Sequence, residues 1–236
     1  MAVAVDATTT AWTDVNGVAT LTVSNLTVGS GSNRALILLL MFGVGSPPAG
    51  ITATWDSGGT NQSMTIIPNT TTADNSVLAG SGVLYGLLAP TSGNKSLVVS
   101  WTGNQEAHAC AISFTGVDQT SVAVAFPHGN TVVHTTITAS PVAVTITSAV
   151  GNMVVAAETQ NAAVFDSTNG TTIAISSGGP NLAIAANYDS GAASVTLSAA
   201  FSSTSTWDAT GCDVLASSGA SSTSPSAGPI YSDFGQ

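Results

Sequence analysis

Hydrophobic and polar residues alternate with a period of two along most of the chain. Six segments show this alternation clearly: residues 19–24, 97–101, 131–138, 142–147, 171–176 and 194–198. They are rich in Val, Ile and Thr, whose branched side chains favour the pleated surface of a sheet. Each segment is therefore predicted to be a half-buried β-strand.

Turn-forming residues separate the alternating segments. Examples are Asn16-Gly17, Ser57-Gly58-Gly59 and Asn169-Gly170. Many short strands between such turns are typical of a β-sandwich or barrel. No segment has the 3.6-residue period of an amphipathic helix, so the pattern predicts an all-β protein.

One segment departs from alternation because it is apolar throughout. Residues 35–44 read ALILLLMFGV, about half the length needed to cross a bilayer. We therefore expect a strand that is buried on both faces.

The first ten residues lack the basic and apolar regions of a secretion signal, and none is expected.

Two parts of the chain show weak sequence similarity to each other. Residues 92–100 resemble 190–198, and each is followed by a strand of small residues that holds a cysteine, Cys110 or Cys212. Two similar halves are typical of a jelly roll, and the loose match is compatible with duplication or with chance. The cysteines are interpreted as small buried core residues, with a disulfide or a reactive thiol as alternatives.

The last twenty-one residues differ in composition from the rest. Residues 216–229 are rich in Ser, Ala, Gly and Pro and predict a linker, after a single β-sandwich domain over residues 1–215. Apolar side chains return in residues 230–236. We expect this C-terminal arm to dock on the domain or on a neighbouring subunit through Ile230, Tyr231 and Phe234.

Charge narrows the range of partners. The 236 residues include 2 Lys and Arg against 12 Asp and Glu, a formal net charge of -10. Binding to nucleic acid needs clustered cations and is excluded, and docking on anionic membranes is disfavoured. At 44% hydrophobic residues the chain is nevertheless expected to fold.

The residues that carry catalysis are sparse. Glu106 and Glu158 are the only glutamates and are far apart in sequence, and no Gly-x-Ser-x-Gly or metal-ligand spacing occurs. We therefore expect no enzyme, no cofactor and no metal site. Among four tryptophans, Trp55, Trp101 and Trp207 are candidates for stacking against sugars, with packing in the core as the alternative.

Three segments together resemble a known group of proteins. Residues 84–93, 97–101 and 111–120 are similar to a pattern in concanavalin A-like/jelly-roll β-sandwich proteins of bacteriophage virions and bacterial surfaces. The segment Ser205-Thr206-Trp207, leading to Val214-Leu215, resembles their closing strand, so the likeness covers about residues 18–215. It implies an antiparallel jelly-roll sandwich with an extended C-terminal tail and brings no catalytic residues.

The expected function follows from this resemblance and from a composition with only 6% charged residues, which leaves mostly neutral groups for contacts. We predict a structural virion protein of a bacteriophage, either a capsid, decoration or tail-associated subunit. It would assemble with copies of itself as a homo-oligomer and with other virion proteins. One alternative is a carbohydrate-binding or adhesion module that binds glycans on a virion or cell surface. Another is an extracellular filament or surface-layer subunit.

Overall fold

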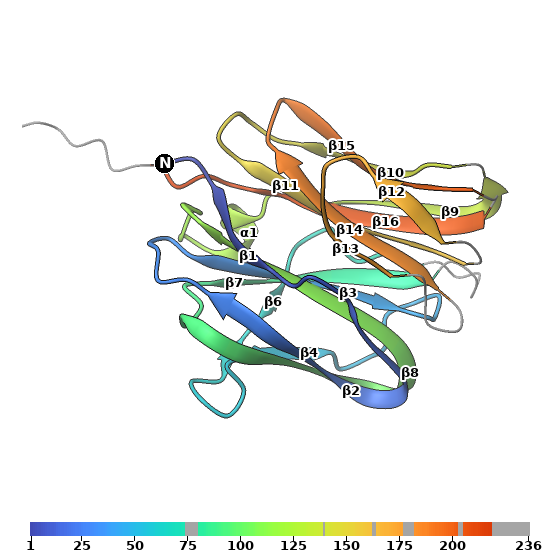
Figure 1. Ribbon diagram of the computed structural model, residues 1–236, viewed down its shortest axis with the longest axis horizontal. Helices are drawn as coiled ribbons and strands as arrows, with labels where there is room; N and C mark the ends of the chain where they lie inside the picture. The colour runs from blue at the N-terminus through green and yellow to red at the C-terminus, as the bar shows by residue number, and fades with distance from the viewer. Residues whose placement is uncertain (74–79, 139, 162–163, 177–181, 203–204, 219–236) are drawn as a thin grey trace, which may run out of the picture.

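Antiparallel β-sheet makes up most of the molecule. The computed structural model describes residues 1–73, 80–138, 140–161, 164–176, 182–202 and 205–218 (Figure 1). Strands account for 63% of the chain and helix for 2%, which confirms the predicted all-β class. Within the described residues the helix is a single turn, α1 (Val122–Ala125), and no helix there is long and apolar enough to span a membrane.

The N-terminal half of the molecule contains the first eight strands. These are β1 (Ala4–Thr8), β2 (Thr13–Val28), β3 (Ala35–Phe42), β4 (Thr52–Trp55), β5 (Gln62–Ser63), β6 (Thr65–Ile66), β7 (Ser81–Leu88) and β8 (Gly93–Thr115). The long strand β8 is shared by two parts of one curled sheet. Its first part pairs with β4 and its last part with β1 and β3, while β2 follows it along most of its length.

The C-terminal half contains the remaining eight strands. These are β9 (Asn130–Thr138), β10 (Val142–Thr147), β11 (Met153–Gln160), β12 (Phe165–Thr168), β13 (Thr171–Ser176), β14 (Ala183–Ser190), β15 (Ser194–Phe201) and β16 (Ser205–Val214). They form a five-stranded sheet in the order β13-β14-β11-β16-β9 and a three-stranded sheet in the order β10-β15-β12. All six alternating segments of the sequence lie within strands, as predicted.

The two halves have the same pattern of strand pairing. The pairs β1·β8, β2·β8, β3·β7, β3·β8, β4·β8 and β6·β7 correspond to β9·β16, β10·β15, β11·β14, β11·β16, β12·β15 and β13·β14. The central strands β3 and β11 each pair with both neighbours over eight residues. This shared register makes each residue of Ala35–Phe42 equivalent to one of Met153–Gln160.

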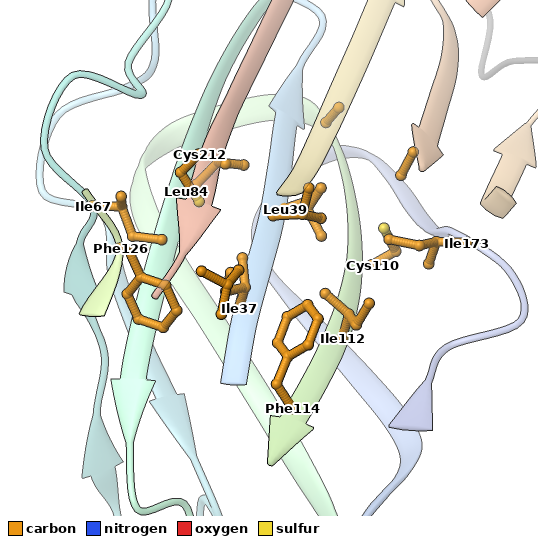
Figure 2. Packing of buried hydrophobic residues seen from close by; sticks show 14 of the residues in the cluster. Ile37, Leu39, Ile67, Leu84, Cys110, Ile112, Phe114, Phe126, Ile173 and Cys212 are labelled. Carbon is orange, nitrogen blue, oxygen red and sulfur yellow. The ribbon is translucent and has the colours of Figure 1, made fainter. Parts of the chain in front are cut away.

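The sheets form four layers with a hydrophobic cluster between each adjacent pair (Figure 1). We call the two middle layers the inner sheets: β6-β7-β3-β8-β1 and β13-β14-β11-β16-β9. The outer layers are β2, β4, β5 and the first part of β8 on one side, and β10-β15-β12 on the other. The cluster between the inner sheets, the seam, joins the halves. Figure 2 shows part of it, including Ile37, Leu39 and Phe114.

Strand β3 confirms the prediction of a strand buried on both faces. All eight of its residues are buried. Ile37, Leu39 and Met41 point into the seam, whereas Leu38 and Leu40 point into the core of the N-terminal half. Burying a side chain of this size contributes about 1.5–3 kcal/mol, so β3 is a major source of stability for both clusters.

Candidate functional site

The three tryptophans considered for sugar stacking lie in the core. Trp55 is fully buried, and Trp101 and Trp207 are each 5% exposed. Trp101 packs edge-on against Phe42 with ring centroids 5.3 Å apart, and Trp207 stacks on His134 at 4.1 Å. These rings therefore present no open face to a sugar, because the strands carrying them are covered on the side to which the rings point.

The predicted anchors of the C-terminal arm lie outside the described residues: Ile230, Tyr231 and Phe234. The last described residues run beside the N-terminus. The amide of Ser217 donates to the carbonyl of Gly116 at 2.7 Å, and the N-terminal amine of Met1 donates to the carbonyl of Ser217 at 3.0 Å. The chain is thus tied to both ends of the N-terminal half up to residue 217.

Both cysteines are free and buried in the seam, which confirms their interpretation as core residues. Burial raises the pKa of each thiol well above its ordinary value. Cys110 pairs with Leu39, and Cys212 pairs with Val155. In the shared register Cys110 is therefore equivalent to Thr210, and the two cysteines lie two residues out of step.

A polar hollow of about 540 Å³ opens on the N-terminal half around an ion pair. The Lys95 ammonium lies 3.2 Å from Oδ1 of Asp56. The other carboxylate oxygen of Asp56 accepts hydrogen bonds from the backbone N–H of Thr60 at 3.1 Å and from its hydroxyl at 2.8 Å. The lining residues are Ser24, Asp56, Ser57, Gly58, Gly59, Asn94, Lys95 and Ser96.

The hydrogen bonds from Thr60, and secondarily Lys95, lower the pKa of Asp56 to about 2. The hollow therefore holds a permanent carboxylate beside one of the two basic side chains of the whole chain. Its other lining groups are mostly small and polar. Such a surface can donate and accept hydrogen bonds with a polar ligand, and its lining includes no aromatic ring.

A second polar group is buried near the seam. The ring of His108 is fully buried, with Nδ1 2.8 Å from a carboxylate oxygen of Asp14 and Nε2 3.2 Å from one of Glu106. Ser176 of the C-terminal half lies 3.5 Å from the other oxygen of Asp14. Both ring nitrogens face carboxylates, so His108 is not placed to activate the Ser176 hydroxyl as a base.

The sequence analysis named Glu106 as an isolated glutamate and did not single out His108 or Asp14. The pairing of β2 with β8 sets Asp14 directly opposite His108, 94 residues away in sequence. The only signal was an acid at a polar position of an alternating strand, and such positions usually face solvent. The group ties together β2, β8 and, through Ser176, the other half.

Glu158 is another buried acid whose position the sequence analysis did not predict. It is fully buried on β11, and neither side-chain oxygen has a hydrogen-bond donor among the described residues. Burial raises the pKa of this carboxyl well above its ordinary value. Across the described part of the chain, no three His, Cys, Asp or Glu side chains are grouped so as to hold a metal ion.

Comparison of the chain with family models, curated proteins and solved structures finds no match.

Proposed function

We propose that the protein is a structural subunit of a bacteriophage virion, built from two jelly rolls, that acts by assembly. The observation that carries this proposal is the strand order of the N-terminal half. Strands 1 and 8, 2 and 7, 3 and 6, and 4 and 5 of a jelly roll pair as one long hairpin folded into two sheets. The pairs β1·β8, β2·β8, β3·β7 and β4·β5 fit this scheme, with β8 supplying strands 7 and 8. Viral capsid proteins are one of the classes that use the jelly roll, beside lectin domains and cupins.

The surface chemistry supports assembly through neutral contacts. The single Lys is paired with Asp56, and the single Arg, Arg34, donates to the carbonyls of Pro90 and Gly31. Both cations are thus engaged within the chain. Since the remaining charges are carboxylates of one sign, contacts between copies of the subunit must rely mainly on hydroxyl, amide and apolar groups, which salt screens little.

The end of the chain supports a C-terminal arm that binds a neighbouring subunit. Ser217 is held by Gly116 of the N-terminal half and Ala216 by Asn152 of the C-terminal half, and the apolar residues Ile230, Tyr231 and Phe234 follow after a Ser-, Ala- and Gly-rich stretch. In the proposed particle these anchors bind a neighbouring subunit. Removing the arm after Ser218 leaves the contacts of Ser217 intact, so this truncation tests the arm without disturbing the described fold.

The test is the mass and shape of the protein in solution, by light scattering followed by electron microscopy. We expect the full chain to form a regular closed assembly, and the chain ending at Ser218 to give smaller species with an unchanged circular dichroism spectrum. A monomer in both cases, at micromolar concentration and without affinity for any particle, would contradict the proposal. A helical filament would instead favour the surface-layer or filament alternative.

The Asp56–Lys95 hollow favours a second candidate, a glycan-binding module on a virion or cell surface. Its hydroxyl, amide and carboxylate groups match the hydrogen-bonding groups of a sugar, although the buried tryptophans contribute no stacking. A glycan array tests this candidate. Binding that is lost in Lys95→Met and kept in Arg34→Met would support it, and an array without hits would remove it.

A further inference from the structure

Two equivalent positions at the centre of the halves hold opposite kinds of side chain. Leu40 is the sixth residue of β3 and Glu158 the sixth residue of β11, in strands that pair over the same eight residues. Leu40 is fully buried in the core of the N-terminal half. Glu158 places a carboxyl at the corresponding point of the C-terminal half.

The surroundings of Glu158 are mostly apolar, and the fully buried Gln160 and Asn187 are its polar neighbours on the same face. Alternation along β11 puts it on the same face as Val154 and Ala156, which belong to the cluster between the inner and outer sheets. Its partners in the two ladders are Ala185 and Ala209, both fully buried. The outer sheet covers this face with apolar side chains, namely Val142, Val144, Ile146, Leu197, Ala199 and Phe201.

Other titratable groups near this core are few. Strands β10 and β15 of the outer sheet carry none, and β12 carries Asp166, which is exposed. On the same face of the inner sheet Asp213 pairs with Val154, four residues along β11, and Asp189 pairs with Val154 from the other side. His134 on β9 stacks on Trp207, and Cys110 lies on the seam side. The fully buried Asp208 of β16, which pairs with Thr159, also faces the seam side. None of these groups hydrogen-bonds to Glu158 among the described residues.

We propose that Glu158 makes the C-terminal half a pH-responsive element, packed while this carboxyl is protonated and loosened when it ionises, while the N-terminal half stays closed. An ionised carboxylate without a partner is strongly disfavoured in an apolar core, so the half opens or admits water in order to solvate it. Protonation removes the charge and leaves only two unpaired polar oxygens. The N-terminal half has Leu40 at this point and therefore no carboxyl there to ionise.

The direction of the pH dependence follows from the raised pKa. The folded C-terminal half holds the proton more tightly than the open state does, in which Glu158 has its ordinary pKa of 4.5. Its contribution to stability is therefore complete below that value and is lost as the pH rises towards the folded pKa. In this window the equilibrium constant for opening rises about tenfold for each pH unit.

The test compares the wild-type protein with Glu158→Gln, which keeps the shape of the side chain but cannot ionise. Hydrogen exchange of both proteins is measured at each pH between about 5 and 8, so that the intrinsic pH dependence of exchange cancels in the ratio. We expect this ratio to rise about tenfold per pH unit in peptides from β10, β11 and β15, and to stay constant in peptides from β3 and β7. A constant ratio in both halves would overturn the proposal, and an equal rise in both would contradict its confinement to one half.

Two further measurements cover the case in which Glu158→Gln folds poorly. Glu158→Leu installs the residue of the equivalent position and should remove the same pH dependence. The infrared carbonyl band of a protonated carboxyl should be present in the wild-type protein at neutral pH and absent from either variant. Asp213→Asn is the matched control, because it removes another buried acid and should leave that band and most of the pH dependence in place. Absence of the band in the wild-type protein would also overturn the proposal.

Discussion

The two halves build the same strand pairings from different cores. In the N-terminal half the central strand points four bulky apolar side chains into its own sandwich: Leu36, Leu38, Leu40 and Phe42. At the equivalent points the C-terminal half has smaller or polar residues: Val154, Ala156, Glu158 and Gln160. The ladder and the alternation of faces are thus enough to define this fold, and the volume of the core is free to differ.

The difference should appear as unequal stability. Each buried CH₂ contributes about 0.8 kcal/mol, and Leu38 carries three more carbon atoms than Ala156. The seam is common to both halves and favours neither. We therefore expect the N-terminal half to be the more stable of the two, with the C-terminal half opening first.

The largest effect is expected from exchanging one residue between the cores. Leu38→Ala gives the N-terminal half the residue of the equivalent position and should lower the free energy of unfolding by about 2–5 kcal/mol, because the cavity does not collapse fully. The reverse change, Ala156→Leu, overpacks the C-terminal core and should cost about 1–3 kcal/mol. Urea denaturation measures both. If Leu38→Ala is nearly neutral, the cores are not as different as the side chains indicate.

In each half, a carboxylate links the last strand to the loop after the second strand by hydrogen bonds, and removing it should have a smaller effect on stability. Asp213 is buried and accepts hydrogen bonds from the Ser148 hydroxyl at 2.6 Å and the Asn152 amide at 2.8 Å. In the N-terminal half the exposed Asp6 accepts from Gly29 and from Ser113, which is equivalent to Asp213.

Asp213→Ala should cost about 1.5–3 kcal/mol, because it leaves the buried Asn152 amide and the partly buried Ser148 hydroxyl without an acceptor. Asp6→Ala should cost less, because Asp6 is exposed and water can replace its carboxylate at Gly29, so that only the Ser113 hydroxyl loses a buried contact. Thermal unfolding of the two variants provides the comparison. If both variants lose the same stability, the difference in exposure between Asp213 and Asp6 does not change the strength of their hydrogen bonds.

Sequence patterns predicted the strands well and the layers poorly. The outer strand β10 is alternately buried and partly exposed, as its period of two indicates. The inner strand β16 is buried at all ten positions although it contains Thr206, Asp208 and Asp213. A period of two identifies the residues that share a face, but not whether that face is covered. Two inner sheets packed on each other bury positions that look exposed in sequence.

The candidate sites illustrate the same limit. The cysteines were predictable as core residues because they lie in runs of small apolar side chains. The burial of Trp55 and Trp207 depends on the sheet that covers each ring. The contact between Asp14 and His108 depends on the register of two distant strands. A local sequence pattern shows neither which sheet covers a strand nor how two distant strands are aligned.

The smallest expected effect is the change in stability at low pH, and it again differs between the two halves. Asp56 of the N-terminal half has its pKa lowered from 3.8 to about 2, so its ionised form stabilises the fold. This contribution is present above 3.8 and is lost as the pH falls through about 2, the reverse of the dependence expected for Glu158. Acid should therefore weaken the N-terminal half and alkali the C-terminal half.

The origin of the Asp56 shift can be tested with Lys95→Met. The largest causes of the lowered pKa are the backbone N–H and the hydroxyl of Thr60, and Lys95 is secondary. The pKa of Asp56 in Lys95→Met, measured by NMR titration of its carboxyl carbon, should remain below 3.8. Thr60→Val, which removes the hydroxyl and keeps the backbone donor, should raise it part of the way. A return to 3.8 in Lys95→Met alone would show that the ion pair, and not the loop, holds this carboxylate in its ionised form.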